Sequence, residues 1–120
     1  LRVLKNLTLL NLGSNTLKGF IPTQFGNQAL GNLEHLLLYD NELKGPIPTH
    51  LGSLAKLNSL RLDGNNLRGT IPMQLRELID LDDLRLNNNT LTGPIPAFLG
   101  NLTKLQILQL QHNELDKAIP

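Results

Sequence analysis

The chain has 120 residues, of which 31 are Leu and 14 are Asn, against three Phe, one Tyr and no Trp. Its 11 Lys and Arg nearly balance its 10 Asp and Glu, which excludes the strong positive field of a dedicated nucleic-acid-binding protein. No apolar run is long enough to cross a membrane, and without cysteine this chain has no disulfide framework.

Short, leucine-rich, strand-like segments recur along the chain at a nearly constant spacing. They begin 26, 24, 24 and 24 residues apart, at Leu7, Leu33, Leu57, Leu81 and Leu105. Each unit follows the pattern LxxLxLxxNxLxGxIPxxLxxLxx, which residues 57–80 (LNSLRLDGNNLRGTIPMQLRELID) match at every position. Such a period is typical of stacked structural repeats. The expected units are a partial repeat at 1–6, repeats at 7–32, 33–56, 57–80 and 81–104, and a truncated repeat at 105–120, with no terminal caps.

Each position of the pattern has a physical role. The alternating LxL segment predicts a short strand with one buried face, so pairs such as Leu36 and Leu38 should point into a core. The asparagine that follows each strand can pair its amide with backbone groups that the turn leaves free. This predicted asparagine ladder comprises Asn15, Asn41, Asn65, Asn89 and Asn113. The glycine suits a bend, and the proline, which has no N–H, suits an extended return segment.

The phrase LxxLxLxxNxLxGxIP resembles the plant-type leucine-rich repeat of receptor-kinase ectodomains, receptor-like proteins and polygalacturonase-inhibiting proteins. The resemblance covers nearly the whole chain. It implies an α/β repeat fold, a right-handed curved solenoid of about five repeats with a parallel sheet on its concave side and a mostly irregular or 3-10 convex side. Three departures stand out. Within FGNQALGN the first unit carries two extra residues, expected as a convex bulge, and Arg76 replaces the glycine found at Gly26, Gly52 and Gly100. Lys117 replaces the glycine of the last unit, so an irregular last turn is expected.

The outward positions of the predicted strands form columns across the concave face. Their chemistry differs from unit to unit while the leucines stay constant, which is what a recognition surface needs. The candidate binding surface comprises His35, Leu37, Tyr39, Arg61, Asp63, Asp83, Arg85 and Gln109.

Two features of this surface each allow two interpretations. Arg61 and Arg85 should be neighbours on adjacent strands and could together hold a carboxylate or phosphate. Alternatively, the nearby Asp63 and Asp83 neutralise them. Tyr39, beside leucines, resembles an interface anchor, although single surface tyrosines are common.

The sequence predicts no catalytic site, cofactor or metal. His35, Ser59 and Asp83 share one column, but a catalytic histidine must lie between nucleophile and carboxylate, and here the serine is in the middle. His35 and His112 should lie about 14 Å apart, too far to share a metal ion. No phosphate-binding glycine loop and no aromatic platform for nucleic acid is present, so we expect no nucleic-acid partner.

Three Asn-x-Ser/Thr sequons are candidate N-glycosylation sites, at Asn6, Asn88 and Asn101. Chance would give roughly one such sequon in this composition, so three slightly favour a secreted protein.

Two functions fit the sequence. The preferred one is a non-enzymatic segment of a recognition domain that binds a protein, peptide or glycan on its concave face, in the extracellular space or secretory pathway. The alternative is a structural subunit or stretch that docks components of a large multi-subunit assembly inside a cell or organelle. The missing caps and cysteines favour the alternative, and the family resemblance favours the first.

Overall fold

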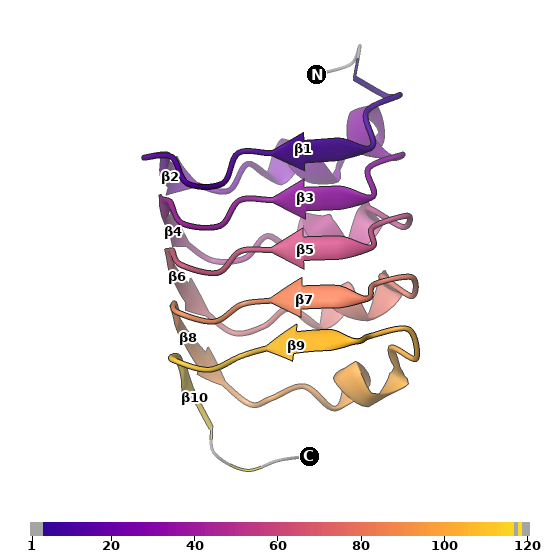
Figure 1. The fold of residues 1–120 in the computed structure, drawn as a ribbon. Coiled ribbons are helices and arrows are strands. Elements are labelled where there is room, and N and C mark those ends of the chain that lie inside the picture. The colour runs from indigo at the N-terminus through magenta and orange to yellow at the C-terminus, as the bar shows by residue number, and fades with distance from the viewer. Residues whose placement is uncertain (1–3, 117, 119–120) are drawn as a thin grey trace.

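The structure is a computed structural model that describes residues 4–116 and residue 118. The start of the predicted partial repeat, the expected irregularity at Lys117 and the final Ile119-Pro120 of the truncated repeat lie outside the described residues. The described chain winds as a right-handed solenoid, as the sequence predicts, with one turn for each repeat (Figure 1).

Two parallel sheets of five strands run along the stack (Figure 1). The concave sheet consists of β1 (Leu9–Asn11), β3 (His35–Leu37), β5 (Ser59–Arg61), β7 (Asp83–Arg85) and β9 (Ile107–Gln109). The second sheet consists of β2 (Lys18–Phe20), β4 (Glu42–Gly45), β6 (Asn66–Gly69), β8 (Thr90–Gly93) and β10 (Glu114–Leu115). The predicted concave sheet is confirmed. The second sheet adds backbone pairing where the sequence indicates only an extended return segment.

Short 3-10 turns close each unit on the convex side. They are η1 (Thr23–Gly26), η2 (Gln28–Leu30), η3 (Thr49–Ser53), η4 (Met73–Glu77) and η5 (Ala97–Asn101). Four of them follow the Ile-Pro step, and the proline holds extended backbone while its carbonyl accepts the first bond, as when Leu51 N–H donates to Pro48 O at 3.2 Å. Among the described residues, no helix has the length and hydrophobicity needed to span a bilayer.

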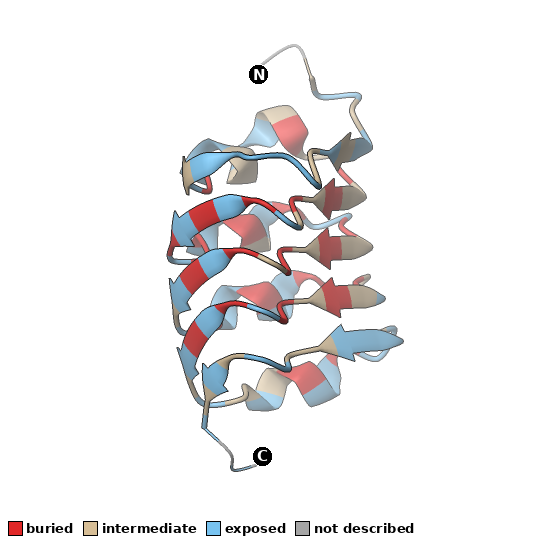
Figure 2. Cartoon of the chain, turned by 60° about the vertical axis from the view of Figure 1, so that its left-hand side comes forward, coloured by how far each residue is buried: buried red, intermediate tan, exposed pale blue. Residues whose placement is uncertain are grey.

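A single leucine core lies between the two sheets and the 3-10 turns. Leu60 beneath the concave sheet, Leu67 beneath the second sheet and Leu75 in η4 are all fully buried. Burying each such side chain contributes roughly 1.5–3 kcal/mol. Figure 2 shows the buried residues recurring at the same place in successive turns. In the last unit Leu108 is 42% exposed, because no described unit stacks beyond β9.

The two sheets differ in register. In the concave sheet each residue pairs with the residue one whole repeat further on, so Arg61 lies beside Arg85. In the second sheet Lys44 pairs with Asn66, two residues short of its repeat equivalent Arg68. Equivalent residues are therefore direct neighbours in the concave sheet and diagonal neighbours in the second sheet.

Arg76 marks a looser contact on the convex side. A Cβ added at Gly26 or Gly52 would lie 2.1 or 2.4 Å from a backbone carbonyl oxygen in the next unit, so glycine lets successive 3-10 turns approach closely. At the corresponding place Arg76 carries a side chain, and η5 packs less extensively on η4 than η4 packs on η3. The two extra residues of the first unit are accommodated in the convex segment that contains the additional turn η2, with Leu30 fully buried.

Candidate functional site

Three residues beyond the end of each concave strand, a residue with left-handed backbone turns the chain toward the second sheet. These residues are Ser14, Asp40, Asn88 and His112, with φ between 52° and 59°, and Gly64 at 69°. Short polar side chains tolerate this conformation better than branched ones. Because this turn has the same backbone conformation in every unit, the outward residues that precede it occupy equivalent positions on successive strands.

The asparagine after this turn joins neighbouring units. Oδ1 of Asn65 accepts from the backbone N–H of Leu43 at 3.1 Å, and its Nδ2 lies 3.0 Å from Leu38 O and 3.1 Å from Leu62 O. Leu38 and Leu43 belong to one unit and Leu62 to the next. Asn41, Asn89 and Asn113 bridge units in the same way. Asn15 is exposed, and among the described residues it donates only within its own unit, to the carbonyls of Leu12 and Gly13.

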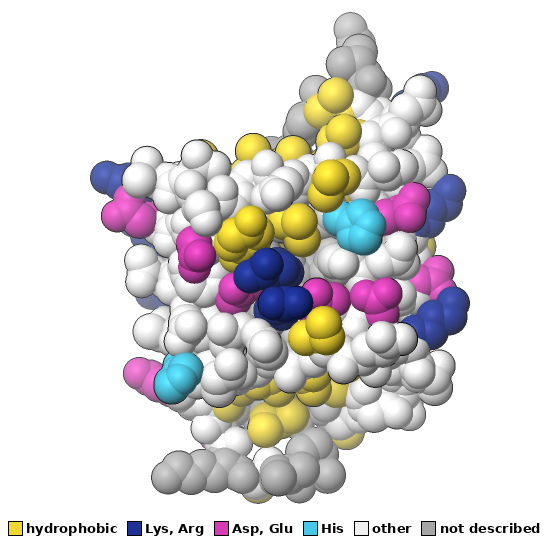
Figure 3. Space-filling view, in the orientation of Figure 1, with side chains coloured by type: hydrophobic (Ala, Val, Ile, Leu, Met, Phe, Trp, Pro, Cys, Tyr) yellow, Lys and Arg dark blue, Asp and Glu magenta, His cyan; other side chains and the backbone are white. Residues whose placement is uncertain are grey.

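Two arginine–aspartate pairs occupy the centre of the concave face. Arg61 donates from Nε and Nη2 to the two carboxylate oxygens of Asp63, at 3.2 and 2.9 Å. Arg85 makes the same two-pronged contact with Asp83, at 2.9 and 3.1 Å. Arg61 and Arg85 are paired in register, and the two ion pairs run in opposite directions along the strands, because Asp63 follows Arg61 by two residues whereas Asp83 precedes Arg85 by two. Figure 3 shows basic side chains at the centre of this face with acidic ones beside them.

This geometry matches the charge-compensation interpretation of the two arginines. The side chains of Arg61 and Asp63 are 26% and 10% exposed, so the pair is partly shielded from solvent. The hydrogen bond that Arg61 donates to Asp63 raises the pKa of Arg61, and partial burial opposes that shift. The guanidinium therefore stays protonated throughout the physiological range. Asp63 supports Arg61 and is itself too buried to be a main ligand contact.

Tyr39 is held in place from two sides. Its ring lies 4.0 Å from the guanidinium carbon of Arg61, a cation–π contact. The ring also covers Gly13, where an added Cβ would lie 2.3 Å from Cζ of Tyr39. Tyr39 is half-buried. It is thus a rigid, amphipathic surface residue, which is the kind that anchors interfaces at low entropic cost.

An apolar patch adjoins these charged groups. Leu9 is 49% exposed and pairs in register with His35, while the half-buried Leu37 pairs with Asn11 and lies diagonally from Leu9. On the other side of the arginines, Ile107 is 38% exposed. Figure 3 shows hydrophobic side chains on both sides of the basic centre. Gln109 pairs in register with Arg85 and completes the predicted surface.

The column that contains His35 does not form a catalytic triad. Nδ1 of His35 lies 3.0 Å from Oγ of Ser59, while Asp83 beyond the serine is bound by Arg85. The carboxylate therefore does not orient the histidine, as a triad requires. Among the described residues, no three His, Asp or Glu side chains gather to bind a metal ion.

The three sequon asparagines are all exposed, at the loop before β1, at the exit of β7 and in η5 (Asn6, Asn88 and Asn101). Sequence reasoning gave no role to Asn87, which is 8% exposed and whose Oδ1 is buried without a hydrogen-bond partner among the described residues. An asparagine at an outward position gives no signal that its side chain will be covered.

Comparison with known families agrees with this geometry. A family model described as Leucine Rich Repeat matches residues 6–28, 32–54, 56–78 and 80–102. The chain belongs to the leucine-rich repeat family. Among curated protein sequences, none matches it.

Several solved structures share the fold of this leucine-rich repeat chain. The plant peptide hormone receptor RGFR1, solved in complex with RGF2, is 37% identical, with a TM-score of 0.88 over 92% of this chain and 18% of that one. The Arabidopsis receptor kinase HAESA, solved with the peptide hormone IDA and the co-receptor SERK1, is 35% identical, with a TM-score of 0.89 over 95% and 19%. The BIR3–SERK2 complex from Arabidopsis thaliana provides a chain that is 40% identical, with a TM-score of 0.87 over 92% and 58%. This chain thus spans less than two thirds of each.

Proposed function

We propose that this chain is a segment of an extracellular recognition domain whose concave face binds a protein or peptide partner and catalyses no reaction. The observation that carries the proposal is the concave face itself. A fixed ladder of strands and asparagines presents exposed apolar side chains directly beside a pair of guanidinium groups. The complexes of RGFR1 and HAESA with peptide hormones support it by similarity of structure.

The apolar side chains and the arginines would contact different parts of the partner. Leu9, Leu37 and the ring of Tyr39 would bury apolar side chains of the partner, which provides most of the binding energy in interfaces. Each arginine has five N–H donors, and its aspartate takes up Nε and one donor of Nη2. The remaining donors of Arg61 and Arg85 face no acceptor among the described residues, so they would bind carbonyl or carboxylate oxygens of the partner.

A capture experiment with matched variants tests this role. The immobilised chain, its Leu37→Asp variant and its Ile79→Asp variant are exposed to the secreted proteins and peptides of the source cells, and bound material is quantified by mass spectrometry. Ile79 is 65% exposed in the loop that follows η4 on the convex side, so Ile79→Asp controls for added charge. We expect partners that the wild type and Ile79→Asp retain and Leu37→Asp loses. Equal retention by all three proteins would contradict a concave binding site.

A further inference from the structure

The outer face of the second sheet carries two cations without counter-charges. Lys44 in β4 and Arg68 in β6 are exposed, and within the part of the chain that the structure describes neither lies within 4.0 Å of a carboxylate. On the same face Lys18 lies 3.9 Å from Glu42. The unpaired positive charge is therefore concentrated on Lys44 and Arg68.

A large exposed aromatic residue adjoins these cations. Phe20 is 58% exposed and pairs in register with Lys44, and its ring covers Gly45, where an added Cβ would lie 2.8 Å from Cε1. Together with Asn66 and the two cations, it lines a hollow of about 300 Å³. The offset register of this sheet places Phe20 beside Lys44, because Lys18, the basic residue one repeat before Lys44, pairs with Glu42 instead.

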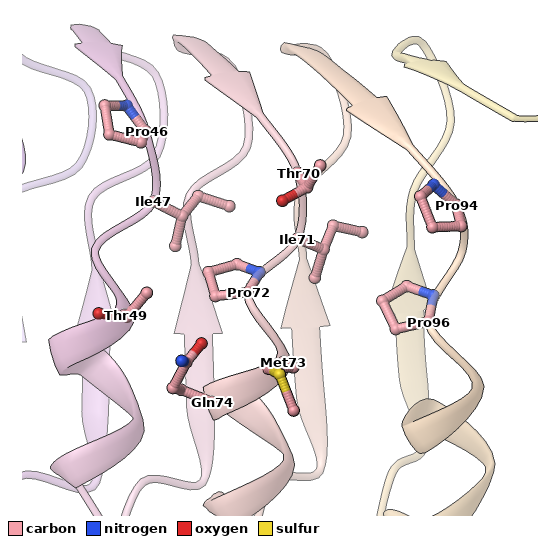
Figure 4. Close-up of a pocket in the computed structure, with 10 residues that line it drawn as sticks. All are labelled: Pro46, Ile47, Thr49, Thr70, Ile71, Pro72, Met73, Gln74, Pro94 and Pro96. Carbon is pink, nitrogen blue, oxygen red and sulfur yellow. The ribbon is translucent and has the colours of Figure 1, made fainter.

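An apolar groove borders the same cations. It has a volume of about 500 Å³ and lies between the second sheet and the 3-10 turns, where Ile47, Ile71 and Pro94 line it (Figure 4). None of the described residues that line it is charged, and Met73, which also lines it, is 55% exposed. Pro46 and Thr70, which also line it, follow Lys44 and Arg68 by two residues. The groove and the cations therefore form one continuous lateral surface.

We propose that this lateral surface is a second docking site, which binds a short segment of a partner protein that carries carboxylates next to apolar side chains. The two unpaired cations complement carboxylates, and the uncharged groove complements aliphatic or aromatic side chains. Two cations are too few for a polyanion such as nucleic acid, which binds through many charge contacts. Exposed Phe, Met and Arg are also the residue types enriched at protein interfaces.

The site lies on a different face from the concave surface and does not depend on it. A ligand on the concave sheet and a protein segment on the second sheet could therefore be bound at the same time. The outward residues of β4 and β6 are exposed to solvent, so the surface can be altered without disturbing the core.

A peptide-binding titration tests the proposal. The probe is a fluorescein-labelled synthetic peptide with three glutamates followed by two leucines and a phenylalanine, and the comparison peptide has glutamine in place of glutamate. The double variant Lys44→Glu/Arg68→Glu should weaken binding of the acidic peptide by more than about tenfold, equivalent to about 1.4 kcal/mol. The matched control Lys5→Glu/Lys56→Glu, in the loops before β1 and β5, should change it less than about twofold. Thr70→Trp, which fills the groove, should weaken both peptides.

Three outcomes would overturn the lateral site. Unchanged affinity in Lys44→Glu/Arg68→Glu would show that the cations do not bind the carboxylates. Equal competition by an acidic oligosaccharide without apolar groups would show a site for polyanions in general. Loss of peptide binding in the concave variant Leu37→Asp would place the peptide on the concave face. Circular dichroism of each variant establishes that the fold is retained, so a loss of affinity can be attributed to the altered surface residues.

Discussion

The concave sheet and the second sheet are built from the same repeat, yet they place side chains next to one another by different rules. In the concave sheet, residues one repeat apart are direct neighbours, as Arg61 and Arg85 are. In the second sheet, the offset register separates equivalent residues, so that Lys44 lies beside Phe20 and Asn66. A repeated sequence therefore determines which positions face outward, whereas strand register determines which of them touch.

This difference explains how the two faces treat positive charge. Arg61 and Arg85 are adjacent and roughly three-quarters buried, and each has its own aspartate. Charges shielded from water require such partners, because desolvation would otherwise be too costly. Lys44 and Arg68 are exposed and diagonal to each other, so water and salt screen them without a partner. The two arginines at the centre of the concave face are thus neutralised by their own aspartates, whereas Lys44 and Arg68 on the lateral surface have no carboxylate partner among the described residues.

The largest effect is expected at the asparagine ladder that joins neighbouring units. Asn65→Ala removes bonds that bridge two units and leaves buried backbone groups unpaired, which should lower the free energy of unfolding by about 3 kcal/mol. Asn15→Ala is the control, because Asn15 is exposed and bonds only its own unit, and it should cost less than about 1 kcal/mol. Urea unfolding followed by circular dichroism measures both. Equal losses would mean that the bridging bonds add nothing.

The next effect concerns the convex side, where close approach depends on glycine. In Gly52→Ala the added Cβ would meet a backbone oxygen of Gln74 at 2.4 Å, so the turns must separate, at about 2 kcal/mol. A Cβ at Gly100 meets nothing within 4 Å, and Gly100→Ala should change stability by less than about 0.5 kcal/mol. Thermal unfolding compares the two variants. If Gly52→Ala were as stable as the wild type, the 3-10 turns could separate without a loss of stability.

A smaller effect separates the ion pairs of the two sheets. Asp63→Asn removes the carboxylate from Arg61, whose side chain is only 26% exposed, and should cost about 1–2 kcal/mol. Glu42→Gln breaks the exposed pair with Lys18, whose side chains are 52% and 77% exposed, and should change stability by less than about 0.5 kcal/mol. Unfolding in low and high salt measures both, and a large, salt-sensitive loss in Glu42→Gln would refute the contrast.

The raised pKa of Arg61 also predicts how the stability of the protein depends on pH. A cation whose pKa is higher in the folded state contributes stability below its unfolded pKa and loses it only as pH rises through the folded value. For an arginine that range lies far above neutrality. The difference in stability between wild type and Asp63→Asn that comes from the protonation of Arg61 should therefore be constant between pH 6 and about pH 9. If the difference in stability between the two proteins changed with arginine deprotonation in this pH range, this prediction would be wrong.

The smallest effect on stability is expected at the sequons. Asn6, Asn88 and Asn101 are exposed, so glutamine at each should be tolerated within about 0.5 kcal/mol. The informative measurement is the intact mass of the native protein before and after enzymatic removal of N-glycans. A loss of mass on deglycosylation is expected of a secreted recognition protein. An unchanged mass would favour the intracellular assembly role instead.

Much of the concave face could be predicted from particular residues. The alternation around Leu36, Leu60 and Leu84 predicts which residues are buried, and the constant spacing predicts that Arg61 and Arg85 are neighbours. The sequence favoured charge compensation for Arg61 but left a ligand site open, because pairing with Asp63 depends on side-chain geometry. The packing of Tyr39 on Gly13 could not be predicted either, because the two residues are one repeat apart and no sequence pattern signals their contact.

By itself the sequence determined the repeat, the parallel concave sheet and the set of outward positions, because hydrophobic periodicity acts within each unit and reports burial directly. Tertiary structure decided the second sheet, its two-residue offset and the lateral surface where Phe20, Lys44 and Arg68 meet. These depend on how one unit stacks on the next. That stacking is set by the asparagine ladder and by close backbone contacts, which act between residues more than 20 positions apart.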